Sequence, residues 1–166
     1  MAEPEGFREF VAARSPTLLR TAWMLTGDAH LAEDLLQAAL ARTWPHWSRV
    51  RDGQPEAYVR RVMVRLQGAW WRRRWRGETP MASVPDTAVA DAFADVEDRA
   101  VLITALASLP PRQRQVVVLR YYDDLPEQEV GVLLGCSTGT VKSQAAKGLA
   151  KLRAALGAGV EVEESR

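Results

Sequence analysis

The sequence predicts an all-α protein made of two small helical domains joined by an acidic, flexible linker. Apolar residues recur at spacings of three and four, and the alternation typical of strands is almost absent. Glycine and proline fall between these runs, where helices end. The stretch 77–98 holds six acidic residues and no basic residue, which marks a linker. We therefore predict domains at 1–77 and 96–158, a linker at 78–95 and a disordered tail at 159–166.

The composition excludes several classes of protein. The chain has 166 residues and a net charge of +1, which by itself says nothing about nucleic acid. Its one cysteine, Cys136, allows no intramolecular disulfide and no cysteine metal cluster. The start MAEPEGFREF lacks an apolar signal core and no apolar run is long enough for a membrane span, so we expect a cytoplasmic protein without membrane insertion. His30 and His46 are isolated and no phosphate-binding glycine loop is present. We therefore expect that the protein is not an enzyme and that it has no catalytic residue, metal or cofactor.

The first domain begins with two helices and a loop. Ser15 and Pro16 predict a helix start, with serine as the cap and proline in the first turn. This helix ends at Gly27, and Asp28 is a good cap for the next helix, which Pro45 interrupts. The segment 48–55 is predicted to be a loop.

A third long helix, beginning near Pro55, combines basic and aromatic residues. No acid lies between Glu56 and Glu78. Arginine offers phosphate contacts and tryptophan offers a face on which an unpaired base can stack. A solvated basic end with arginine stems covering tryptophan is the alternative, and we favour nucleic acid. The candidate residues are Arg61, Arg65, Trp70, Trp71, Arg72, Arg73, Arg74 and Arg76.

The second domain starts near Val96 and leads to a pair of helices in the stretch 125–152. An apolar helix there ends at Pro110-Pro111, and the next helix carries Val116 to Tyr121. In the pair, Gly135 permits the left-handed backbone of a helix end, and Ser137 or Thr138 can cap the last helix.

The last helix has an apolar face and a cationic outer surface. Its apolar positions are Val141, Ala145, Leu149 and Leu152. No acid lies between Glu129 and Glu161. A helical hairpin with a solvated lysine face is the alternative, but the glycine turn and the absence of acids favour insertion into a DNA major groove. The candidate contacts are Thr138, Thr140, Lys142, Ser143, Gln144, Lys147 and Lys151.

Four segments in this order resemble a known family. They are GDAHLAEDLLQ, WWRRRWRGE, LPPRQR and LGCSTGTVKSQ. The chain resembles the two-domain bacterial RNA polymerase sigma factors of the extracytoplasmic function type, and within them the SigE-like subgroup of actinobacteria. The resemblance extends from about Phe7 to Leu156.

The resemblance implies roles for both domains. The first would match region 2, with a loop at 50–55 and a following helix that meet the −10 element, where duplex is opened. The second would match region 4, whose helix from Thr138 to Lys151 reads the −35 element. In region 2, a helix would bind the clamp of the largest polymerase subunit through Asp34, Leu35, Gln37 and Leu40. The implied partners are bacterial core RNA polymerase, promoter DNA and an anti-sigma factor.

Two departures from the family pattern stand out, and two other functions compete. Gly131 replaces the usual alanine, and Arg65 stands where the subgroup often has asparagine. A free-standing helix-turn-helix regulator would leave the Trp/Arg helix unexplained and would need a dimerisation surface. A sigma-like decoy that binds only an anti-sigma factor would not need a basic recognition helix.

Overall fold

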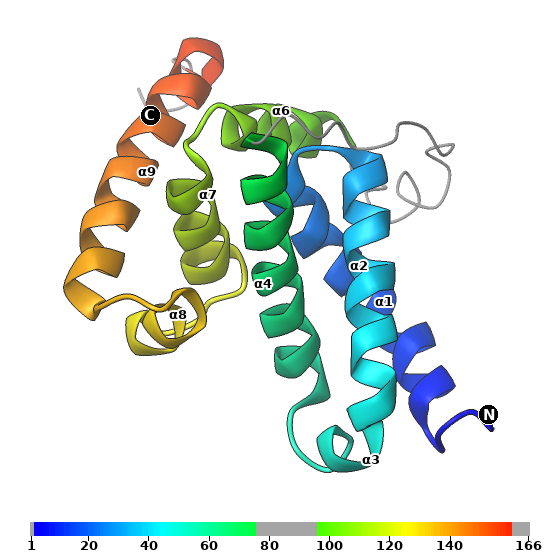
Figure 1. Cartoon of the computed structure of the whole chain (residues 1–166). Coiled ribbons are helices and arrows are strands. Elements are labelled where there is room, and N and C mark those ends of the chain that lie inside the picture. Colours follow the sequence, from blue (N-terminus) through cyan, green and yellow to red (C-terminus); the bar gives the residue numbers. More distant parts are fainter. Residues whose placement is uncertain (1, 76–95, 161–166) are drawn as a thin grey trace. The chain divides into compact units, whose positions relative to one another are not determined.

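The helical segments predicted from the sequence form two separate units. The computed structural model describes residues 2–75 and 96–160, with side chains for 2–71 and 99–157. The chain divides into unit 1, Met1–Ala92, and unit 2, Phe93–Arg166 (Figure 1). The described residues form helices and turns and no strand, which confirms the all-α prediction.

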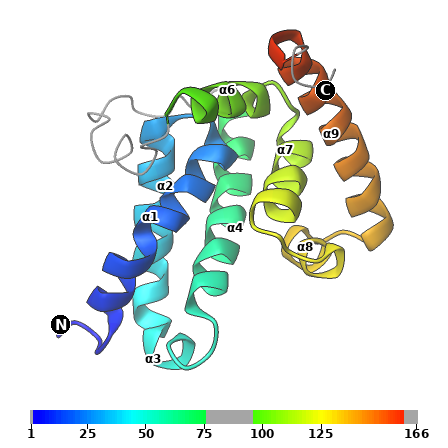
Figure 2. The same ribbon diagram turned by 180° about the vertical axis from the view of Figure 1, so that it is seen from behind.

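Three long helices form the core of unit 1. They are α1 (Phe7–Thr26), α2 (Ala29–Thr43) and α4 (Pro55–Trp75), and α2 packs against both others (Figure 2). Gly27 has a φ of 72° and ends α1, and its N–H donates to the Trp23 carbonyl. Asp28 caps α2 as predicted, since its carboxylate accepts from the backbone N–H groups of His30 and Leu31.

The predicted helix start at Ser15-Pro16 is wrong. Helix α1 begins at Phe7 and runs through Pro16 without a break. Proline only removes one N–H donor and strains the preceding turn, and neighbouring packing can outweigh this cost. Here Phe7 is buried and contacts two tryptophans, which holds the first turns of α1 on the unit.

The predicted loop at 48–55 is shorter than expected. A 3₁₀ turn, Trp44–His46, leads directly into the short helix α3 (Trp47–Val50), which leaves 51–54 as the connection to α4. The buried side chains of Trp47 and Val50 explain the extra helical turn, because it places both against the core.

Unit 2 contains four α-helices among its described residues. They are α6 (Val96–Ala107), α7 (Pro111–Val117), α8 (Glu127–Leu134) and α9 (Thr138–Val160). Helix α7 continues as a π-helical turn, Val118–Tyr122, and Asp124 then takes a φ of 55° in the turn that leads to α8. Helix α9 packs along α7 and α8 (Figure 1).

The turn between α8 and α9 forms as the sequence predicts. Gly135 has a φ of 69° and its N–H donates to the Gly131 carbonyl. Ser137 is the cap, because its hydroxyl accepts from the Thr140 N–H at 3.1 Å. These two residues fix where α9 starts.

The ends of the predicted domains fall partly outside the described residues. The predicted linker 78–95, Arg76 and residues 161–166 of the predicted tail lie outside them. Helix α9 reaches Val160, so the first two residues of the predicted tail are helical.

Candidate nucleic-acid interface

One side of α9 is built into the core of unit 2. Val141, Ala145 and Leu152 are buried there as predicted, while Leu149 is half-buried. Gly148 is also buried, and a Cβ at this position would lie 2.6 Å from Val117 Cγ2. The apolar pattern of the sequence did not single out this glycine, although it lies three residues after Ala145 on the same face.

The opposite side of α9 is a ridge of small residues. At about 100° per residue, Gly139, Ser143, Ala146 and Ala150 point away from the core. All four are exposed. We call them the small-residue ridge, and a helix with such a ridge can approach the floor of a groove closely.

Lysines stand on both flanks of the small-residue ridge. Lys142 lies on one flank, and Lys147 and Lys151 lie on the other, and all three are exposed. Two flanks of positive charge fit the two phosphate walls of a major groove. Alanine methyls also offer apolar contact to thymine methyls, so Ala146 is a candidate that the sequence analysis missed.

The remaining predicted residues of α9 differ in how freely they can contact DNA. Thr138 is exposed in the first turn. Thr140 is exposed, but its hydroxyl lies 3.0 Å from the Ser137 hydroxyl. Gln144 is half-buried and lies between the core side and the Lys147 flank. Ser143 is therefore the polar side chain best centred on the ridge.

An acidic residue of α8 lies beside this surface. Glu127 Oε2 is 3.8 Å from Lys142 Nζ. This pair could not be predicted from the acid-free sequence of α9. Glu127 belongs to α8, and only the turn between the helices brings it near Lys142.

The basic helix of unit 1 presents part of its predicted surface. Arg65 and Trp71 are exposed, and Arg61 and Trp70 are half-buried. The backbone of Arg72, Arg73 and Arg74 is helical, since α4 runs to Trp75, while their side chains lie outside the described set.

The predicted polymerase-binding residues on α2 divide into two groups. Asp34 and Gln37 are exposed, but Leu35 is 0% exposed and Leu40 is 5% exposed. A polymerase contact through the two leucine side chains stays a prediction. They lie on the core side of α2, where they support the helix that presents Asp34 and Gln37.

The connection between α3 and α4 carries an arginine that the sequence analysis missed. Arg51 Nη1 lies 3.7 Å from Glu5 Oε2, and Arg51 Nε lies 3.8 Å from Asp52 Oδ1. Residues 51–54 are all exposed. Arg51 was missed because only a contact across 46 residues distinguishes it from other surface arginines.

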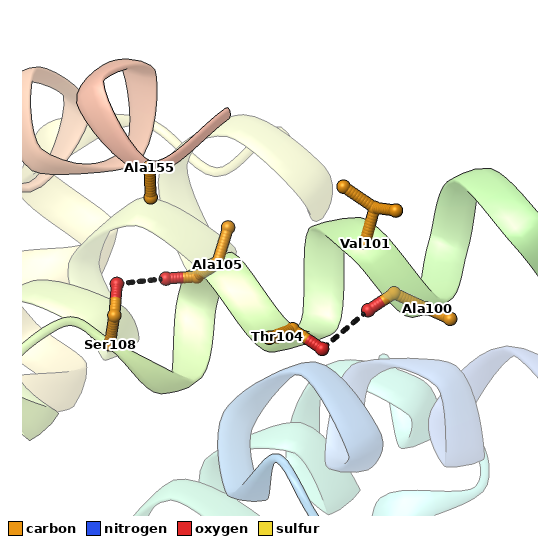
Figure 3. A pocket seen from close by; sticks show the side chains of 6 residues that line it. All are labelled: Ala100, Val101, Thr104, Ala105, Ser108 and Ala155. Carbon is orange, nitrogen blue, oxygen red and sulfur yellow. Dashed lines mark hydrogen bonds between the residues drawn. The ribbon is translucent and has the colours of Figure 1, made fainter. Parts of the chain in front are cut away.

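A groove of about 430 Å³ lies between α6 and α9 (Figure 3). Val101, Ala105 and Ala155 contribute apolar side chains to it. The Thr104 and Ser108 hydroxyls donate to the Ala100 and Ala105 carbonyls of α6 itself. The lining residues therefore offer no convergent set of polar groups of the kind that positions a small ligand.

Two further observations concern the described residues alone. Within 2–75 and 96–160, no cluster of three or more His, Cys, Asp or Glu side chains is placed to hold a metal ion. In the same ranges, no helix has the length and apolar character needed to cross a bilayer.

Comparison with known proteins matches both units. The model of Sigma-70 region 2 matches residues 10–77, and that of Sigma-70, region 4 matches residues 99–152. The chain is 43% identical over 154 residues to the RNA polymerase sigma-E factor of Streptomyces coelicolor, covering 92% of this chain and 87% of that protein. It is 30% identical over 149 residues to the ECF RNA polymerase sigma factor SigL of Mycobacterium tuberculosis, covering 86% of this chain and 84% of that protein.

A solved structure shares the fold. It is the sigma factor RpoE of Bartonella quintana in complex with the anti-sigma factor NepR, with a TM-score of 0.70 and 20% identity. The match covers 96% of this chain and 99% of that chain. With both region models in order, and relatives of this identity and coverage, the chain belongs to the sigma-70 family and is an RNA polymerase sigma factor of the extracytoplasmic function type.

Proposed function

We propose that this sigma factor divides promoter recognition and polymerase binding among three surfaces. Helix α9 enters the major groove of the −35 element. Helix α4 and residues 51–54 meet the −10 element, and the exposed side of α2 contacts core polymerase. The two DNA tasks differ, because base edges are read in an intact groove whereas unpaired bases expose their faces.

The small-residue ridge of α9 carries the −35 assignment. Its exposed side chains are short enough for the helix backbone to lie deep in the groove. Lys142 and Lys147 then reach phosphates on either side, and Ser143 and Ala146 face the base edges. Thr138, Thr140, Gln144 and Lys151 remain proposed contacts around this centre.

The −10 assignment rests on the exposed part of α4. Trp71 is 38% exposed and follows Trp70 along the helix, so stacking of an unpaired base is available there. Arg61, Arg65, Arg72, Arg73, Arg74 and Arg76 are proposed to neutralise the backbone of the opened strands.

The polymerase assignment rests on Asp34 and Gln37, the exposed pair among the four residues proposed on α2. We propose that the chain contributes positioning and DNA opening but no catalysis, which belongs to core polymerase. We also propose that it acts in the cytoplasm, where that enzyme transcribes. An anti-sigma factor is a further proposed partner. The RpoE–NepR complex supports this proposal, because in it a protein of this fold is bound by an anti-sigma factor.

An experiment on α9 tests the central proposal. We expect purified protein with bacterial core polymerase to initiate transcription from genomic fragments in a run-off assay. Ala146→Leu should then lower initiation on −35-dependent promoters by about tenfold or more, because the added carbons stand between the helix and the groove floor. Ala154→Leu is the matched control, since Ala154 is exposed on α9 two turns farther along. Equal effects of the two substitutions would contradict insertion of the ridge.

A further inference from the structure

The N-terminal turn of unit 1 lies against α3, the helix that leads into the connection 51–54. The Trp47 indole Nε1–H donates to the Glu5 carbonyl at 2.7 Å, a contact across 42 residues. The same indole contacts Phe7 and Phe10, with ring centroids 5.3 Å and 5.0 Å away. The backbone of the turn is therefore fixed to α3.

Gly6 allows the chain to make this turn. It has a φ of 83°, and a Cβ there would still meet only Trp47 atoms at 3.9 Å or more. The turn closes with hydrogen bonds from the Phe7 N–H to the Pro4 carbonyl and from the Phe10 N–H to the Gly6 carbonyl. The backbone of Glu5 is thus held in place, while its exposed carboxylate extends into water beside Arg51.

The carboxylate of Glu5 meets Arg51 at the start of the connection. Their charged atoms lie 3.7 Å apart, and the Glu5 side chain is 89% exposed. Because the pair faces water, it is weak and exchangeable. The guanidinium is therefore available to a phosphate, which offers a stronger charge-assisted contact than a solvated carboxylate does.

We propose that Arg51 is a DNA-contacting residue of the −10 surface, and that Glu5 is its intramolecular counter-ion, which competes with the phosphate of the opened strand. This inference rests on the assignment of residues 51–54 to the −10 element. Asp52 also lies near Arg51, but it belongs to the same connection and moves with it. Glu5 belongs to the N-terminal turn and stays with Trp47 when Arg51 turns to DNA.

The test compares charge-matched variants of the full chain in holoenzyme, on a fork-junction promoter fragment from which wild-type holoenzyme initiates. We expect Glu5→Gln to tighten binding about two- to fivefold at low salt, with the gain lost at high salt. Glu9→Gln removes the same charge from the exposed side of α1 and should have a smaller effect. Arg51→Ala should weaken binding and lower the slope of log affinity against log salt by about 0.7 to 0.9.

The double variant decides whether the two residues act on each other. In the Arg51→Ala background, Glu5→Gln should tighten DNA binding no more than Glu9→Gln does. The melting temperature of the double variant should match that of the Arg51→Ala variant. A gain that persists without Arg51, or equal effects of Glu5→Gln and Glu9→Gln, would overturn the inference. If the Arg51→Ala variant binds the fragment as tightly as wild type and initiates normally, the inference is overturned and the proposed function stands. Failure of wild-type holoenzyme to initiate at all would remove the proposed function as well.

Discussion

Gly131 and Cys136 approach each other so closely that a Cβ on Gly131 would lie 2.7 Å from the Cys136 carbonyl oxygen. The Cys136 N–H also donates to the Gly131 carbonyl at 2.9 Å. The first helix of the helix-turn-helix and the turn are therefore in backbone contact, and this contact sets the angle at which α9 leaves α8.

Gly131→Ala should destabilise unit 2, although alanine is the usual residue of the family here. Alanine gains about 1 kcal/mol of helix propensity. Displacing the backbone carbonyl of Cys136 costs more, about 1–3 kcal/mol by analogy with overpacked cores. Chemical denaturation followed by circular dichroism measures the net loss. Gly157→Ala in α9 is the control, because nothing lies within 4 Å of its added Cβ and stability should be unchanged or higher.

Gly148→Ala should loosen the packing of α9 on α7. The added Cβ would lie 2.6 Å from Val117 Cγ2 and 3.3 Å from the Gln113 carbonyl oxygen. We expect the unfolding midpoint in denaturant to fall. Val117→Ala removes the clashing methyl, so the double variant should be more stable than the sum of the single changes predicts, by about 0.5–3 kcal/mol. Strict additivity would show that the two side chains do not meet.

Gln144→Ala should change sequence preference in the upstream element without a uniform loss of affinity. A glutamine amide can pair with an adenine edge, whereas lysines mainly neutralise phosphate. Run-off transcription from promoters with single substitutions in the −35 element measures the preference. Lys151→Ala is the comparison on the same helix and should weaken all promoters alike. The same uniform loss for Gln144→Ala would leave it no role in specificity.

Replacement of Arg72, Arg73 and Arg74 by alanine should weaken promoter opening and lower the salt dependence of binding. Each lost phosphate contact reduces the salt slope by about 0.7 on single-stranded DNA. Permanganate reactivity of thymines in the −10 region reports opening. Replacement of Arg8, Arg14 and Arg42, which are exposed on α1 and α2, removes the same charge and should leave opening nearly intact. Normal opening by the first variant at moderate salt would argue against the assignment.

Most of the helix ends that the sequence predicted correctly depend on local features. Asp28, Gly27, Gly135 and Ser137 act through their own backbone neighbours, so their roles follow from short-range chemistry. The prediction failed at Pro16, because the contacts that keep α1 continuous come from Trp44 and Trp47, many residues away.

The sequence by itself determined that this chain is helical, where α9 begins, and that basic residues are segregated from acids along α4 and α9. Only the tertiary structure decided which candidate residues are accessible and which charges meet: it buried Leu35 and Leu40 on α2, and it brought Glu127 to Lys142 and Glu5 to Arg51. The physical reason is range. Capping and periodicity act within about one helical turn, whereas burial and charge pairing depend on segments that meet only after the chain has folded.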